Sequence, residues 1–550
     1  MTRDDPPARD DQDIEDSSNS CQKEKLTIED AVDRAVTKIN LKLLLLYIFA
    51  GSSMLNSAIN TLATVFTGHV PYREWVCVGN STRCIAAHAA SSQDTFYTQQ
   101  GLCNNDLQEG TDFLWTSQHT TFAQQWGLFC ENEAKLTLIS SIYFIGSFLG
   151  MLTSTGIFDR FGRKRGALFG AVISFVSVGL STIAPNYEVL LLLRLLAGYS
   201  QIVSYTGTYC WIMELTPKSY RNLVSGTVRL NFSVSYFTLI GIAYWLDNWR
   251  YMYAACTVIN AICILPLIVL PESPRFHLIR GMEKEAKSTL QSFSRITESK
   301  SGQFDLSKIN LVYEIRVQNF FQQVKDFKDY PIMLKETLIA MYSWFMLACV
   351  SYGYSFGWSK IGHNIYTSCT FDAIGQSIVF VSAVPICTVL GRKNTILFFL
   401  LGSMTCNLIA MINYRISEQW TVELIASMVG AMSTNGAFLM MYLFIIERAP
   451  TSHSGMIFSL GSGSARLGSF LSPQVNLLYG VTNRRVPLGL YAGLAFLSLL
   501  GICAMPDTTG KNIPETPADI ERTKRGDATG NDKAEINGTV IENPEIITEK

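Results

Sequence analysis

Long apolar runs separated by short polar stretches make up most of the sequence between residues 43 and 506. A membrane-spanning helix needs about 20 apolar residues, because the hydrocarbon core of a bilayer is about 30 Å thick. Twelve runs have about this length: 43–66, 136–158, 166–187, 195–213, 230–246, 251–271, 337–359, 373–391, 395–414, 424–446, 455–483 and 486–506. The pattern predicts an all-α membrane protein with twelve transmembrane helices in two six-helix halves.

Polar segments flank and divide these helices. We expect an N-terminal tail over residues 1–42, the first helix over 43–66, a long loop over 67–134, helices two to six over 135–271, a central loop over 272–336, helices seven to twelve over 337–506 and a C-terminal tail over 507–550. The central loop has the composition of short amphipathic helices, and the end of the C-terminal tail that of an unstructured segment.

The charge balance supports a membrane class and excludes others. Only 16% of the 550 residues are charged, against about 25% in soluble proteins. The net charge of -1 leaves no basic excess for binding nucleic acid. Lys and Arg gather in the loops after the second and eighth apolar runs: Arg160, Arg163, Lys164, Arg165, Arg392 and Lys393. The positive-inside rule then predicts a multi-pass membrane protein with both termini in the cytoplasm. We expect the protein to lie in the plasma membrane.

The long loop carries four cysteines and a glycosylation sequon. In an extracellular loop, Cys77, Cys84, Cys103 and Cys130 predict two disulfides, with three pairings possible. Asn80 begins an Asn-Ser-Thr sequon in the same loop. The alternative is four free thiols and an unused sequon.

Two motifs recur in the two halves. Gly162-Arg-Lys follows the second apolar run and Gly391-Arg-Lys the eighth, while Glu214-Leu-Thr-Pro ends the fourth and Glu447-Arg-Ala-Pro the tenth. Parallel repeats of this kind form carriers whose substrate site lies near the bilayer midplane, between the halves.

The motifs together resemble a known family. Asp-Arg-Phe-Gly-Arg-Lys at 159–164 is similar to the signature between helices two and three of the major facilitator superfamily. Pro-Glu-Ser-Pro-Arg at 271–275, the cysteine-bearing loop, Gln-Trp-Gly-Leu-Phe-Cys at 125–130, Arg-Leu-Leu-Ala-Gly at 194–198 and Pro-Asp-Thr-Thr-Gly at 506–510 are similar to the organic ion transporters, solute carrier family 22. The resemblance implies the twelve-helix major facilitator fold and transport of small organic ions.

The resemblance also implies a charged latch that stabilises one of two alternating states. The candidate gating residues are Asp159, Arg163, Arg194, Glu214, Arg221 and Glu447. The second half should hold the weaker latch, because no acid stands beside Gly391 and Ser454 replaces an Arg that is usual in the family. The alternative is ordinary anchoring by positive charge.

Arg466 is the strongest candidate for substrate binding, because it stands alone inside an apolar run. A guanidinium at that depth is costly unless it faces protein or a water-filled cavity. There it could bind a carboxylate in bidentate geometry. Organic anion and carnitine-type members of the family carry an Arg at this place, whereas the organic cation members carry an Asp. The alternative is a structural ion pair with Glu447 or Asp372.

Other candidates concern a positive group on the substrate. Asp372 and Gln376 are four residues apart, hence on one helix face, and Asp372 could bind an ammonium unless it lies in the outer loop. Tyr352 and Trp211 could hold a quaternary ammonium by cation–π attraction, although packing is the simpler role for an aromatic residue.

The sequence therefore predicts a secondary transporter of organic anions or carboxylate-bearing, carnitine-like zwitterions. The partners expected are a small organic ion and the lipid bilayer, and the oligomeric state stays open. We expect no metal, cofactor or enzymatic activity, because no nucleophile–base pair, metal-ligand cluster or Walker A motif is present. The alternatives are an organic cation transporter, a sugar porter and a non-transporting receptor or vesicle-type relative.

Overall fold

Twelve long helices dominate the computed structural model of the chain. They are α2–η2–α3 (Leu41–Gly51, Ser52–Met54 and Asn56–Thr67, counted as one), α7 (Glu133–Phe161), α8 (Arg163–Ser181), α9 (Tyr187–Glu214), α10 (Arg221–Trp245), α11 (Trp249–Val269), α15 (Pro331–Ile361), α16 (Ile365–Leu390), α17 (Arg392–Ile416), α18 (Trp420–Arg448), α19 (Ser454–Val481) and α20 (Arg485–Cys503). Ten of the helices in the described part of the chain are long and apolar enough to cross a membrane, and α10 and α19 match them in length at 25 and 28 residues. The predicted twelve-helix fold is confirmed.

The structure describes most of the chain with interruptions. The described residues are 24–35, 41–72, 74–78, 84, 102–103, 107, 109, 111–217, 220–296, 309–312, 320–361, 364–416, 420–450, 453–482, 485–508, 514 and 516–525. Asn80, the predicted glycosylation site, lies outside them.

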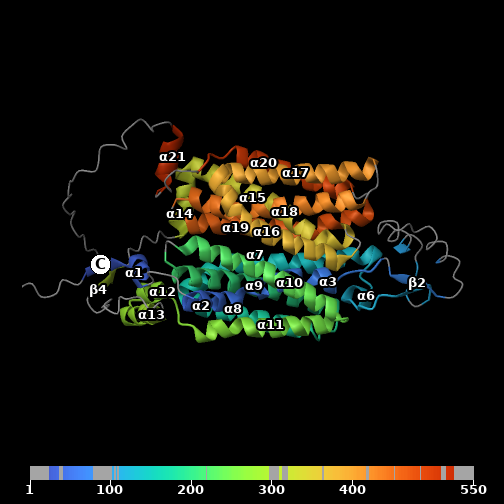
Figure 1. The fold of residues 1–550 in the computed structure, drawn as a ribbon, viewed down its shortest axis with the longest axis horizontal. Helices are drawn as coiled ribbons and strands as arrows, with labels where there is room; N and C mark the ends of the chain where they lie inside the picture. The colour runs from blue at the N-terminus through green and yellow to red at the C-terminus, as the bar shows by residue number, and fades with distance from the viewer. Residues whose placement is uncertain are drawn as a thin grey trace, which may run out of the picture.

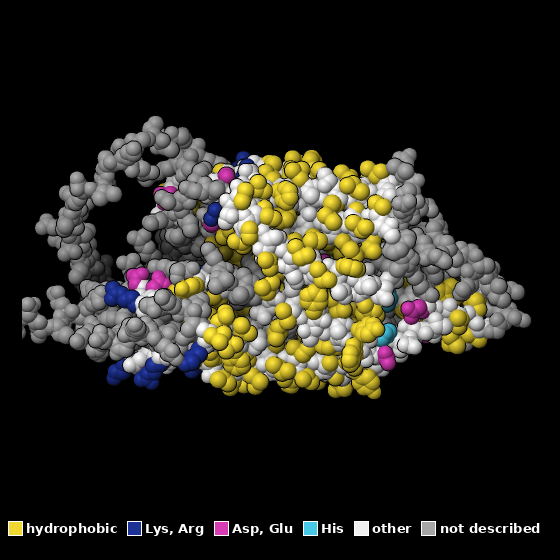
Figure 2. Space-filling view, in the orientation of Figure 1, with side chains coloured by type: hydrophobic (Ala, Val, Ile, Leu, Met, Phe, Trp, Pro, Cys, Tyr) yellow, Lys and Arg dark blue, Asp and Glu magenta, His cyan; other side chains and the backbone are white. Residues whose placement is uncertain are grey.

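The helices form two halves that lie side by side (Figure 1). The N-half contains α2, α3 and α7–α11, and the C-half contains α15–α20. Their outer surfaces are largely apolar, as the band of hydrophobic side chains in Figure 2 shows. Phe175, Val258 and Ile378 are examples of large hydrophobic residues exposed on this surface. Such a surface suits lipid, since hydrocarbon and not water would be its solvent.

We call the two ends of the bundle the loop end and the terminal end. The loop end carries β2 (Trp75–Cys77), which pairs antiparallel with β3 (Phe113–Trp115), and α6 (Phe122–Gln125). The structure joins Cys77 to Cys84 and Cys103 to Cys130, which selects one of the three possible pairings.

The terminal end carries the short elements of the tails and the central loop. These are β1 (Glu24–Thr27), α1 (Ile28–Ala35), α12 (Pro274–Ile279), α13 (Glu283–Ile296), β4 (Ile309–Val312), α14 (Phe320–Asp329) and α21 (Pro517–Arg525). β1 pairs in parallel with β4, so that the N-terminal tail joins the central loop.

Part of the C-terminal tail is ordered, in contrast to the sequence-based expectation. In α21 the side chain of Ile520 is buried, and the Glu521 carboxylate accepts a hydrogen bond of 2.8 Å from the backbone N–H of Ile332. The tail therefore caps the first turn of α15, whose N–H groups have no partner within the helix.

The closest helix contacts depend on glycine. At Gly198 of α9, an added Cβ would lie 1.9 Å from the carbonyl oxygen of Tyr143 in α7. Small residues let helix backbones approach closely in membranes, where van der Waals packing drives association. Gly198 thus sets the distance between α7 and α9.

We predict that Gly198→Ala prevents this packing and sharply lowers the yield of folded protein. Overpacking costs about 1–3 kcal/mol or more, because backbone must move. The matched control is Gly156→Ala in α7, where an added Cβ meets nothing within 4 Å. Size-exclusion profiles of fluorescent fusions measure the folded fraction, and equal profiles for the two variants would contradict the role of Gly198.

Candidate functional site

A cavity of about 130 Å³ lies between the N-half and the C-half. Both halves supply its walls, which contain both polar and aromatic residues. The lining residues are Ser57, Thr61, Tyr143, Phe144, Ser147, Gln201, Ile202, Tyr205 and Phe232 from the N-half, and Ser351, Tyr352, Ser355, Gln376, Phe380, Asn435, Phe438, Leu439, Tyr442 and Arg466 from the C-half.

Arg466 projects from α19 into this cavity, where tyrosines and no acidic residue of the described part of the chain surround it. Tyr143, Tyr352 and Tyr442 stand around the guanidinium, Tyr352 within hydrogen-bonding reach, and the Nε atom has no hydrogen-bond partner among the described residues. The two acids that could have neutralised it are engaged elsewhere. Glu447 pairs with Arg392, and Asp372 accepts a hydrogen bond of 3.2 Å from Gln376. Neither of the ion pairs considered for Arg466 is formed.

Asp372 lies inside a helix and not in the outer loop. α16 begins at Ile365, so Asp372 sits two turns into the helix and is only 3% exposed. It does not line the cavity, whereas Gln376, one turn further on, lines the cavity and donates a hydrogen bond to the Asp372 carboxylate. The helix begins before the apolar run 373–391 that predicted it, because Asn364 caps it by accepting hydrogen bonds from the backbone N–H groups of Tyr366 and Thr367.

Trp211 is not among the residues that line the cavity, whereas Tyr352 is. The Trp211 indole is fully buried and donates a hydrogen bond of 3.0 Å to the carbonyl oxygen of Pro271. It packs in the hydrophobic cluster of the terminal end with Tyr47 and Leu267. Trp211 therefore has a packing role, and we remove it from the candidate substrate contacts.

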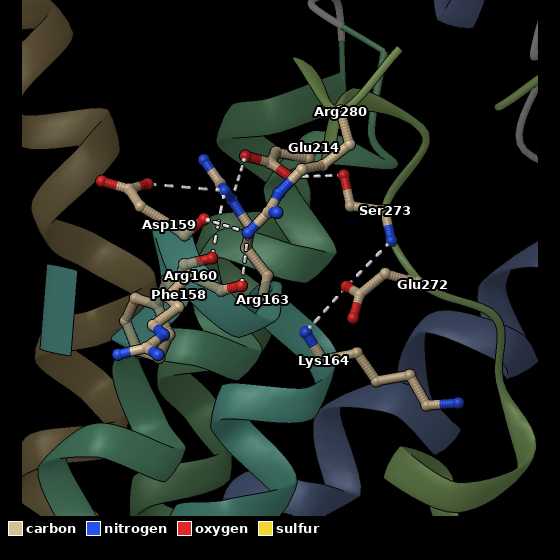
Figure 3. A network of polar contacts seen from close by, with 9 residues as sticks. All are labelled: Phe158, Asp159, Arg160, Arg163, Lys164, Glu214, Glu272, Ser273 and Arg280. Carbon is tan, nitrogen blue, oxygen red and sulfur yellow. Dashed lines mark hydrogen bonds and ion pairs between the residues drawn. The ribbon is translucent and has the colours of Figure 1, made fainter. Parts of the chain in front are cut away.

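Charged residues at the terminal end of the N-half form a compact network (Figure 3). The Arg163 side chain at the start of α8 donates from Nε to Glu214, which ends α9, over 3.0 Å. Asp159 lies 3.6 Å from the same guanidinium, and Ser273 donates to the other oxygen of Glu214. Three of the predicted gating residues therefore meet, with Ser273 as a member that sequence reasoning missed.

Glu272 holds the turn between α7 and α8 in this network. Its carboxylate accepts hydrogen bonds from the backbone N–H groups of Lys164, over 2.8 Å, and Arg165, over 3.2 Å. These N–H groups begin α8 and lack partners in the helix. Gly162 has a φ of +100°, and an added Cβ would lie 2.6 Å from the Glu272 carboxylate. The turn thus requires glycine for its backbone angle and for its space.

The C-half repeats the same arrangement. Arg392 at the start of α17 lies 3.0 Å from Glu447 in α18, and Thr508 donates to Glu447 over 3.2 Å. Thr508 corresponds to Ser273, since Pro506-Asp-Thr follows the last helix as Pro271-Glu-Ser follows the sixth. The C-half lacks a counterpart of Asp159, where Thr388 stands, and its Arg392–Glu447 pair is more exposed than the Arg163–Glu214 pair.

Two predicted gating residues lie outside these networks. Arg221 donates over 3.3 Å to the carbonyl oxygen of Thr216, so it closes the turn between α9 and α10. Arg194 is 20 residues from Glu214 in the same helix, about 30 Å along its axis. It is buried near the loop end, donates to the carbonyl oxygen of Asn60 and lies 4.7 Å from the ring of Tyr143. Neither contact forms part of the terminal-end networks.

The profile of the family described as "Sugar (and other) transporter" matches residues 84–361 and 362–511, which is more than half of the chain. The chain belongs to this family of transporters. It is therefore a major facilitator superfamily transporter and not an enzyme, and the resemblance to solute carrier family 22 is confirmed.

Relatives of the transporter include three curated proteins of similar length. Organic cation/carnitine transporter 2 of Homo sapiens is 26% identical over 76% of this chain and 74% of its own. Solute carrier family 22 member 1 of Oryctolagus cuniculus is 25% identical over 81% and 79%. Organic cation/carnitine transporter 2 of Arabidopsis thaliana is 26% identical over 83% and 86%.

Solved structures share the fold of the transporter. The inward-open xylose transporter XylE from E. coli has a TM-score of 0.59 at 14% identity and covers 87% of this chain and 99% of its own. The proton:xylose symporter XylE bound to 6-bromo-6-deoxy-D-glucose has a TM-score of 0.58 at 15% identity, with coverage of 87% and 98%.

The two halves of the transporter are joined at the loop end. The Lys360 ammonium at the end of α15 forms an ion pair with Glu133, the first residue of α7. Gln474 of α19 accepts from Thr137 over 3.3 Å, and the Tyr366 ring of α16 stacks on Phe66 at 5.8 Å. The loop end is therefore closed. Sequence reasoning missed this gate, because charges at helix ends look alike whether they face water or a partner.

We predict that Glu214→Gln destabilises the transporter more than Glu447→Gln does. The side chains of Arg163 and Glu214 are 15% and 11% exposed, against 35% and 17% for Arg392 and Glu447. Removing one partner of a buried pair costs about 3–5 kcal/mol, whereas an exposed pair contributes about 0–1 kcal/mol. Because both pairs are only partly buried, the expected losses lie between these limits.

Thermal unfolding in detergent measures the difference. The two substitutions are matched, since each replaces one Glu that accepts bonds from an Arg and a hydroxyl. An equal or larger fall in Tm for Glu447→Gln would contradict the account.

Proposed function

We propose that this transporter carries small organic ions bearing a carboxylate, either organic anions or carnitine-like zwitterions, across the plasma membrane by alternating access. The observation that carries the proposal is Arg466 in the cavity between the halves, with tyrosines and not an acid around its guanidinium. A cation at that depth is costly without a counter-charge. A substrate carboxylate would supply that charge with bidentate hydrogen bonds.

The walls of the cavity suit the rest of such a substrate. Phe144, Phe232, Phe380 and Phe438 line it together with the tyrosines. Their faces would pack against an aryl ring or attract a trimethylammonium group by cation–π interaction. For a zwitterion, the positive group would meet these rings and the Gln376 amide. Asp372 would act behind Gln376 and not as a direct contact.

The gating networks support two alternating states. With the loop end closed, Arg163 and Arg392 pair with acids of their own half, and the Asp159 side chain remains 66% exposed at the terminal end. We infer that Asp159, Arg163, Glu214 and Glu447 stabilise the opposite state by drawing the two terminal ends together. The structure is then the state that faces the terminal end.

The orientation belongs to the same proposal. Arg160, Lys164, Arg165 and Lys393 cluster at the terminal end, as the positive-inside rule expects for a cytoplasmic face. The two disulfides at the loop end suit an oxidising exterior. Substrate would therefore be released from the present state into the cytoplasm.

The charge of the substrate separates the competing functions. The relatives' names include both organic cation and carnitine, and the family includes sugar transporters. A neutral sugar requires no buried cation, and an organic cation would be repelled by Arg466. The carboxylate preference thus rests on this residue.

We predict that Arg466→Ala abolishes the uptake of carboxylate substrates at normal surface abundance. A charge-assisted hydrogen bond contributes about 1.5–3 kcal/mol. Affinity should therefore fall by roughly 10- to 150-fold. Arg466→Lys is the matched variant, which keeps the charge but loses the bidentate geometry, and should retain part of the uptake. Radiotracer uptake with surface biotinylation measures both quantities. Unchanged uptake and KM in Arg466→Ala would refute the assignment.

A further inference from the structure

A second pocket, of about 80 Å³, lies between the halves at the loop end. Its polar and charged lining is concentrated around the ion pair that closes the gate: Thr64, His69, Tyr72, Glu133, Thr137, Ser140, Ser359, Lys360 and Asn476. The pocket lies apart from the cavity that contains Arg466, and the two share no lining residue.

Lys360 is the one Lys or Arg among the described residues that line this pocket. Its ammonium holds the Glu133 carboxylate from the other half and donates to the carbonyl oxygen of Asn476 over 3.3 Å. His69 does not compete as a cation at neutral pH. Burial, and then the charge of His119, lower the pKa of His69 to about 4.

The helix dipoles favour both charges of the Glu133–Lys360 pair, but little water reaches them. Glu133 begins α7 and Lys360 lies in the last turn of α15, so each charge is at the helix end that the helix dipole favours. The two side chains are only 9% and 18% exposed. If either partner is removed, the remaining charge is left without its counter-charge in a closed interface.

The pocket has a further donor without an acceptor. The Tyr72 hydroxyl is buried in the pocket wall, where its oxygen lies near the backbone N–H of Cys130, and its O–H group has no acceptor among the described residues. An ammonium and an O–H donor at one small polar pocket could together hold the two oxygens of a carboxylate. While the loop end is closed, the Lys360 ammonium is paired with the Glu133 carboxylate.

We propose that Lys360 is an outer binding site for carboxylates, and that Glu133 is its resident ligand while the loop end is closed. An entering carboxylate would take the place of Glu133 on Lys360. Closure of the gate and binding of the anion then exclude each other, so the anion stabilises the open state by mass action. The inference rests on the proposed function, since a carboxylate substrate would meet Lys360 before it reaches Arg466.

The test uses the full-length transporter with a reporter cysteine at Ser141. This residue is fully buried in α7, where its hydroxyl donates to the carbonyl oxygen of Phe470 across the interface, and it lines neither pocket. A membrane-impermeant thiol reagent should reach Ser141→Cys only when the loop end opens. The protein that retains Ser141 is the control, and its labelling gives the background from the native cysteines.

Glu133→Gln and Lys360→Gln should each accelerate labelling by about tenfold or more, because each leaves a partly buried charge unpaired in the closed state. The two variants change the local charge in opposite directions. An effect on the charged reagent alone would therefore raise one rate and lower the other. If both variants are labelled at the same rate as the Ser141→Cys protein without them, the Glu133–Lys360 pair does not hold the loop end closed.

Benzoate in the outside medium tests the anion site. The experiment is done with Arg466→Ala added, so that Lys360 is the site under test. Benzoate should accelerate labelling when Lys360 is present and not in Lys360→Gln, and uncharged methyl benzoate should change neither. The inference would be overturned if benzoate accelerated labelling equally in the Lys360→Gln variant. It would also be overturned if benzoate did not accelerate labelling of the protein that retains Lys360.

These results are separable from the proposed function. If the unmodified transporter takes up neither benzoate nor a carnitine-like zwitterion, carboxylate transport is refuted. The labelling rates would still report whether Lys360 binds a carboxylate at the gate.

Discussion

The cost of placing a charge in hydrocarbon constrains the whole transporter. An unpaired ion in the bilayer core has no water to solvate it, so charged groups lie at helix ends, pair with one another, bind backbone carbonyls as Arg194 does, or face a cavity. Most charges here obey the first two conditions: Arg163 with Glu214, Arg392 with Glu447, and Lys360 with Glu133 lie at the ends of the bundle. Arg466 meets the last condition, because it faces the cavity between the halves.

This constraint also gives the two ends of the bundle different roles. At the loop end, an ion pair, hydrogen bonds and a stacked tyrosine join the two halves. At the terminal end, the charged networks lie within each half and use the repeated motifs of α8 and α17. The same sequence repeat therefore gives two similar networks at the terminal end, while the Glu133–Lys360 ion pair at the loop end joins the start of α7 to the end of α15. Alternation between states would exchange one set of contacts for the other.

The fold and the place of Arg466 in a cavity between the halves could be predicted from the sequence, because both follow from local patterns. Apolar length predicts twelve helices, and an isolated Arg466 in an apolar run predicts a cavity. The pairing of the four cysteines could not be predicted, because it depends on the folded loop. The position of Asp372 was uncertain because helix α16 begins in a polar stretch capped by Asn364. The sequence could not show that Trp211 lies outside the cavity and Arg194 outside the terminal-end networks, because an aromatic or charged residue in a helix can face any neighbour. The Glu133–Lys360 pair could not be predicted from the sequence, because it joins helix ends that are distant in sequence.

The central claim is that Arg466 gives the transporter its preference for carboxylates. Uptake of three labelled probes by cells expressing the transporter tests this claim most directly: a carnitine-like zwitterion, an aryl carboxylate and tetraethylammonium. The account predicts uptake of the zwitterion, the aryl carboxylate or both, with tetraethylammonium taken up no faster than by control cells. Uptake of tetraethylammonium alone would contradict it.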